Sequence, residues 1–153
     1  MWYAPVSDFD VIQGTTASPT TLAERVTIDG DHTFTTGNGF YKCYVTPNTL
    51  KMDVESTGSR DSRGAKQMAT GFIPGDRAEN AGLFRVAKND AFIVVIKSCD
   101  GTVKQIGTQC SPADFVGGFQ SGTNEDGEKG WTFNVESYGN GDLFYPGNIV
   151  EKV

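Results

Sequence analysis

The sequence AFIVVIKSCDGTVKQIG, residues 91–107, carries the strongest indication of a β-sheet in this chain. Its first part, Ala91 to Lys97, is apolar on both faces and β-branched, which is typical of a central strand covered on both sides. Asp100-Gly101 then has the chemistry of a tight hairpin turn, and a second alternation begins at Val103. Residues 91–107 therefore predict a β-hairpin whose first strand lies inside a sheet.

Two segments outside this hairpin alternate like strands that are buried on one face only. Leu50 to Glu55 and Trp131 to Glu136 each place apolar side chains on one face and polar or charged ones on the other. The remaining extended segments are predicted at residues 40–45 and 65–73 and, as a short hairpin, at 25–28 with 33–35. Residues 112–118 contain Pro112 and Gly117-Gly118 and are expected to form a looser connection.

One substantial helix is expected, from about Asp76 to Lys88. Asp76 and Glu79 have the spacing of a capping box, in which each side chain accepts from an unpaired backbone N–H at the helix start. Apolar residues between them and Lys88 fall on one stripe, and Lys88 complements the dipole at the helix C-terminus.

Size and composition favour one mainly β domain over residues 1–153. The chain has 153 residues with 19 Gly, 10 Phe, 5 Tyr and 2 Trp, which is a turn-rich composition with much aromatic burial. The predicted fold class is a β-sandwich or barrel with one flanking helix. A Thr-rich segment near residues 14–21 is expected to be flexible, and residues 56–64 are expected to form a mobile loop.

Charge, hydropathy and cysteine usage exclude several classes of protein. The formal net charge of −6 disfavours sequence-specific nucleic-acid binding, because the protein would repel polyphosphate. The longest apolar run, Ala91 to Ile96, is far shorter than the roughly 20 residues of a membrane helix. Three widely spaced cysteines fit reduced thiols in a cytoplasmic setting, and Met1 to Pro5 lack the basic start and apolar stretch of an export signal.

Catalytic and metal chemistry find little support in the sequence. His32 is the only histidine, so any Ser-His-Asp or Cys-His mechanism would have to use it, and a solvated turn is the simpler interpretation. The cysteines lack zinc spacing, and the acidic segments 29–31 and 124–128 are interpreted as turns rather than calcium loops. We therefore predict no enzyme activity, no catalytic, cofactor-binding or metal-binding residue, no cofactor and no small-molecule substrate.

Exposed aromatic rows could bind sugars by stacking. The candidate pairs are Trp131 with Tyr138 and Tyr41 with Tyr44. The same residues could equally belong to the core or to a subunit interface, which we favour.

The order of features resembles that of small structural proteins of tailed bacteriophage particles, in particular tail tube proteins. The similarity runs from about Thr27 to Gly147 and rests on Gly39-Phe40, the polar loop at 56–64, Phe72 to Gly75 before one helix, residues 89–96, Asp100-Gly101, Gln105 to Gly107, Pro112-Ala113, and Ser121 to Thr123 before residues 131–138. The resemblance implies a β-sandwich or barrel that assembles into hexameric rings, which stack into a hollow tube.

This resemblance implies partners and a location. The expected partners are copies of the same chain and other virion proteins, in a virion assembled in the host cytoplasm. Candidate assembly contacts lie in the two polar segments, because such segments can order on neighbouring copies; they are Thr15, Thr16, Arg60, Asp61 and Arg63.

Two other roles within the particle and two other classes of function remain open at this stage. A capsid auxiliary, decoration or connector protein would fit the same features. The alternatives from other classes are a carbohydrate- or protein-binding β module and a small hydrolase that uses His32. For a tube, an acidic wall is expected, since passing DNA would not stick to it.

Overall fold

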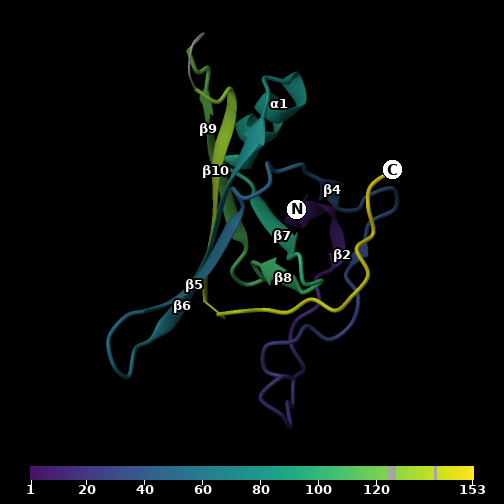
Figure 1. The fold of residues 1–153 in the computed structure, drawn as a ribbon. Helices are drawn as coiled ribbons and strands as arrows, with labels where there is room; N and C mark the ends of the chain where they lie inside the picture. Colours follow the sequence, from purple (N-terminus) through teal and green to yellow (C-terminus); the bar gives the residue numbers. More distant parts are fainter. Residues whose placement is uncertain (124–126, 140) are drawn as a thin grey trace.

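A computed structural model of the chain describes residues 1–123, 127–139 and 141–153. Figure 1 shows a curled sheet with one helix against it and long connections at both ends of the chain. The elements in order are β1 (Trp2–Pro5), the 3-10 turn η1 (Val6–Asp8), β2 (Phe9–Val11), β3 (Thr33–Phe34), β4 (Tyr41–Lys42), β5 (Lys51–Thr57), β6 (Gly64–Pro74), α1 (Ala78–Ala87), β7 (Ala91–Lys97), β8 (Val103–Ile106), β9 (Ala113–Gln120) and β10 (Gly130–Gly139).

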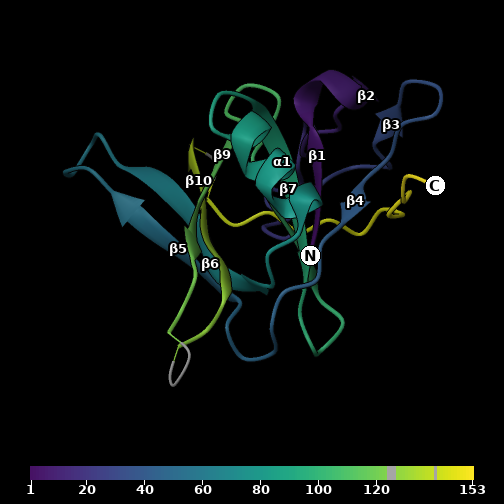
Figure 2. The same cartoon turned by 90° about the horizontal axis from the view of Figure 1, so that it is seen from above.

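The main sheet is antiparallel and has the strand order β4-β1-β7-β9-β10-β6-β5, with β8 also paired to β7. One edge of β7 pairs with β1, and its other edge is shared by β8 and the start of β9. The sheet curls into a half-barrel, which Figure 2 shows from above. The predicted fold class, a mainly β barrel or sandwich with one flanking helix, is confirmed.

A first core fills the concave side of the half-barrel. Phe84 of α1 packs there against Phe115 and Trp131, with ring centroids 5.4 and 4.9 Å apart. The buried members of this core are Ala69, Ile73, Phe84, Ala87, Phe92, Val94, Ile96, Ile106, Ala113, Phe115, Phe133 and Val135.

A second core lies on the opposite face of β7, under the connections at both ends of the chain. Its buried members are Ala4, Phe9, Ile28, Phe40, Ile93, Val95, Leu143 and Tyr145. The side chains of β7 alternate between the two cores, so the prediction of a central strand covered on both faces is confirmed.

The predicted helix is confirmed at Ala78–Ala87, but its predicted capping box is wrong. The residue at the N-cap position is Arg77, and no side chain caps the helix start. Asp76 instead lies 3.6 Å from Lys129, so its carboxylate pairs with an ammonium group of the β9–β10 loop.

Three local predictions are also wrong. Residues 25–28 do not pair with 33–35, because β3 pairs with β2 and Thr27 and Ile28 form isolated bridges to Phe144 and Thr15. The expected strand at 40–45 is limited to Tyr41–Lys42. Residues 113–120, expected in part as a loose connection, form the eight-residue strand β9.

Candidate functional site

The main sheet has two edges whose backbone groups lack partners in the described chain. Strand β5 ends the strand order and pairs only with β6. Strand β9 pairs with β7 only through Ala113 and Asp114, so the edge from Phe115 to Gln120 is open on the side away from β10. Unpaired N–H and C=O groups along a sheet edge are a template for adding another strand.

The other end of the sheet is closed by the chain itself. The backbone N–H of Phe40 donates to the carbonyl of Val150 at 2.8 Å, and the N–H of Lys152 donates to the carbonyl of Phe40 at 2.9 Å. The C-terminal segment thus pairs with Phe40, just before the short strand β4, which leaves the longer edges of β5 and β9 as the candidate sites for a further strand.

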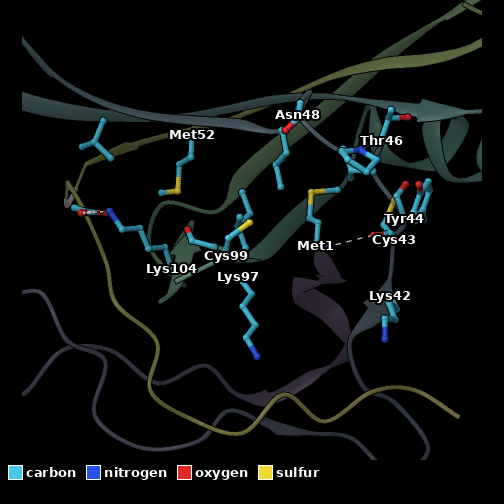
Figure 3. A pocket seen from close by; sticks show the side chains of 17 residues that line it. Met1, Lys42, Cys43, Tyr44, Thr46, Asn48, Met52, Lys97, Cys99 and Lys104 are labelled. Carbon is cyan, nitrogen blue, oxygen red and sulfur yellow. Dashed lines mark hydrogen bonds and ion pairs between the residues drawn. The ribbon is translucent and has the colours of Figure 1, made fainter. Parts of the chain in front are cut away.

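An apolar groove borders the open edge of β5. It has a volume of about 940 Å³ and runs between β5, the segment after β4 and the turn after β7. Figure 3 shows that Met1, Met52 and Cys99 come from different elements around it. The apolar lining is Met1, Val45, Leu50, Met52, Val54 and Ile96.

Charged and thiol groups also line this groove. Lys42 and Lys97 lie on its rim, and Lys104 at one end is held by Asp142 at 2.7 Å. Burial raises the pKa of the Cys43 thiol to about 11, so it stays protonated and is a weak nucleophile at neutral pH. The groove therefore offers mainly apolar contacts, with ammonium groups at its rim.

Strands β9, β10, β6 and β5 form a four-stranded sheet whose outer face no other described element covers (Figure 1). By strand parity, the charged side chains on that face are Asp53, Glu55, Asp114, Glu136, Lys51 and Lys66. The face is thus net acidic. Lys66 pairs with Glu136 at 3.0 Å and Lys51 with Asp53 at 2.6 Å, which leaves the remaining carboxylates unneutralised.

The predicted contact residues lie in two projecting segments. Arg60, Asp61 and Arg63 are exposed in the turn between β5 and β6, whereas Thr15 and Thr16 start the connection from β2 to β3, where Thr15 forms a bridge to Ile28. The two segments are separate in Figure 1, so the structure does not bring these five residues into one site. Their role in assembly stays a prediction.

His32 is buried, so its interpretation as a solvated turn residue is wrong. Only 2% of its surface is exposed, and its ring stacks on Tyr145 with centroids 4.6 Å apart. The N–H of Gln13 donates to Nδ1 at 3.0 Å, so Nε2 carries the proton and donates to Oε1 of Gln105 at 2.7 Å. Both ring nitrogens are used within the core, which gives the imidazole a structural role.

The His32 contacts predict a loss of stability on acidification. Burial lowers the pKa of His32, so the folded state holds the neutral ring while the unfolded state takes up a proton below about pH 6.5. The free energy of unfolding should therefore fall as the pH drops below that value. His32→Gln should lower the free energy of unfolding by about 2 kcal/mol at pH 8. The variant should then lose less of its free energy of unfolding than the wild-type protein when the pH falls below about 6.5, as measured by urea unfolding at pH 8 and below about pH 6.5. An equal pH dependence in the two proteins would contradict this role.

The aromatic pairs considered for sugar stacking are not arranged as platforms. Trp131 faces the first core and stacks on Phe84, whereas Tyr138 is 54% exposed and lies on the opposite face of β10. Tyr41 stacks on Tyr3 at 5.5 Å, and Tyr44 is exposed. These contacts support a core role for Trp131, whereas Tyr41 packs on the partly buried Tyr3.

The acidic turns do not form a metal site in the described part of the chain. No group of three or more His, Cys, Asp or Glu side chains converges among the described residues. Asp31 accepts from the backbone and side-chain amide of Asn148, which anchors the C-terminal segment. Of the turn at 124–128, residues 124–126 lie outside the described residues and Glu128 is exposed.

The cysteines are unpaired, and the helix α1 is too short to span a membrane. Cys43, Cys99 and Cys110 are free thiols. Within residues 1–123, 127–139 and 141–153, no helix has the length and apolar character needed to cross a membrane.

Comparisons with known proteins identify no relative. No protein family model, no curated protein and no solved structure matches this chain. Any functional conclusion therefore rests on the geometry of the edges, the groove and the acidic face.

Proposed function

We propose that this chain is a structural component of a bacteriophage particle, a tail tube protein whose copies join edge to edge into rings that stack into a tube. The observation that carries the proposal is the pair of open edges on one four-stranded sheet. Three successive antiparallel pairings separate β9 from β5, so the two edge strands run in opposite directions. The β5 edge of one copy can therefore pair with the β9 edge of the next as another antiparallel ladder.

This kind of contact leads to a ring. Because the two edges are different surfaces, each copy can bind one neighbour on either side, and the chain of copies closes if the rotation between them allows it. Both edge strands carry a partly exposed apolar side chain: Val54 on β5 is 39% exposed and Phe119 on β9 is 40% exposed. Pairing of the backbone edges would bury such side chains, and apolar burial stabilises the association.

The uncovered face of the four-stranded sheet would become the wall of the channel. Its carboxylates outnumber its ammonium groups, so the wall would repel the phosphates of passing DNA instead of releasing counterions and binding it. The partners of the chain would be its own copies and other virion proteins. A capsid auxiliary, decoration or connector protein could use the same edges, which makes it the alternative role within a particle.

The proposal is tested by the size and shape of the purified full-length protein. We expect light scattering to show an oligomer and negative-stain microscopy to show rings and tubes. A monomer at all concentrations would overturn the proposal. A monomer that also binds a glycan array would favour the carbohydrate-binding module, and closed shells or caps without tubes would favour the capsid or connector role.

A further inference from the structure

The turn between β5 and β6 projects as a defined cationic tip, formed by residues 58–63. Gly58 has a φ of +87°, and a Cβ there would meet the carbonyl oxygen of Ser62, so the turn requires glycine. The N–H of Ser62 donates to the carbonyl of Ser59 at 3.0 Å and closes the turn. Arg60 and Arg63 are exposed on it, and neither forms an ion pair within the described chain. With Asp61 as the only carboxylate, the tip has a net positive charge.

The opposite end of the same sheet is acidic. Strand β6 ends at Pro74, opposite Gly130 at the start of β10, so Asp76, Glu79 and Glu128 lie near this end. All three are exposed. Asp76 is 3.6 Å from Lys129 with both side chains more than half exposed, whereas neither Glu79 nor Glu128 forms an ion pair with a described residue. The carboxylates at this end outnumber its cations, which are Arg77 and Lys129.

Strand direction places these charges at opposite ends of one copy. β5 and β10 run in the same direction; the cationic tip follows the end of β5, and the acidic end precedes the start of β10. Figure 1 shows the β5–β6 turn and the start of β10 at opposite ends of the sheet. Copies stacked along the strand direction in one orientation would therefore place a cationic tip against an acidic end.

We propose that the rings stack through this contact: Arg60 and Arg63 of one copy bind the carboxylates of Asp76, Glu79 and Glu128 in a second copy of the adjacent ring. This inference rests on the proposed function and names the residues that join one ring to the next. Arginine suits the contact because its planar guanidinium binds carboxylates through two parallel hydrogen bonds. Opposite charges at the two ends also exclude a ring added in the reverse orientation, since like charges would then meet.

The contact predicts that salt affects stacking and ring formation differently. Salt screens exposed charges over a Debye length that falls from about 10 Å at 0.1 M to about 3 Å at 1 M, whereas backbone pairing and apolar burial between sheet edges are much less sensitive. Raising the salt concentration should therefore convert tubes into separate rings, as seen by negative-stain microscopy and light scattering.

Charge reversal provides the decisive experiment. The double variants R60E/R63E and D76K/E128K should each form rings, and their tube length should fall at least tenfold. When preformed rings of the two variants are mixed in equal amounts, they should form tubes again with the variants alternating, because the reversed tip of one variant meets the reversed end of the other and the native tip meets the native end. The matched control R60K/R63K keeps the positive charge and should retain tubes.

The outcomes separate this inference from the proposed function. Normal tubes from either reversed variant, or no tubes from the mixture, would overturn the stacking contact while rings from the wild-type chain still support the proposed function. Loss of rings in R60E/R63E would place the tip within a ring and also overturn it. If the wild-type chain forms no rings, the proposed function fails and the stacking contact fails with it.

Discussion

Replacing Gly117 with alanine is expected to lower the free energy of unfolding by about 2 kcal/mol, because the added methyl group would overlap the ring of Phe84. A Cβ at Gly117 would lie 2.5 Å from Cδ1 of Phe84 and closer still to Cε1. Phe84 is 5% exposed and packs against Phe115 and Trp131, so moving its ring would disturb both aromatic contacts. The Phe84 ring, α1 or β9 would have to shift.

Gly118 provides the matched control for this prediction. It is the next residue on the same strand, and a Cβ there would meet no atom within 4 Å. Gly118→Ala should change the free energy of unfolding by less than about 0.5 kcal/mol, since it creates no overlap. Guanidinium unfolding of both variants, followed by tryptophan fluorescence, measures the difference. Equal effects at the two positions would show that α1 does not pack closely on β9.

The same two glycines explain why β9 could not be predicted. Adjacent glycines usually mark a turn, and nothing in the local sequence states that Gly117 lies under an aromatic ring from a helix about thirty residues earlier. The missing side chain allows Phe84 to approach the strand. One of the two open edges was therefore absent from the sequence prediction, although Phe115 and Phe119 alternate as a strand would.

The strand at the start of the chain, β1, also could not be predicted, because its partner is distant in sequence. β1 lies beside β7, with Tyr3 opposite Val94, but its four residues are too short to show a clear alternation. By contrast, β5, β6, β7 and β10 are long and carry strong alternation or continuous apolar character, and they were predicted close to their observed bounds.

The burial of His32 beside the second core could not be predicted for the same reason. Its neighbours Asp31 and Thr33 are polar and typical of a turn, so the local sequence indicates exposure. The ring is buried by Tyr145 and Gln105, which are distant in sequence. The exposed positions of Arg60, Asp61 and Arg63 could be predicted because a Gly-punctuated polar segment needs no distant partner.

The proposed edge contact predicts that a lysine at either open edge abolishes ring formation. Val54→Lys and Phe119→Lys each place a charge on the concave side of an edge strand, where pairing with a second copy would bury it. An inward-pointing charge is a known means of blocking edge pairing. We expect a cost of about 3 kcal/mol per contact, roughly a hundredfold in Kd, so both variants should be monomers by light scattering. Val11→Lys, 45% exposed on β2 and away from both edges, should assemble normally.

Mixing the two variants tests whether the contact joins two different edges, β5 of one copy and β9 of the next. Val54→Lys retains a native β9 edge and Phe119→Lys retains a native β5 edge, so an equal mixture should form a heterodimer that cannot grow at either end. Light scattering should then give twice the subunit mass. If β5 paired with β5 of a second copy instead, Phe119→Lys alone would form dimers and mixing would change nothing, because a symmetric contact uses the same surface on both copies. Only a contact between two different edges makes each variant a monomer alone and the mixture a heterodimer. A contact of this kind is also the one that can close into a ring.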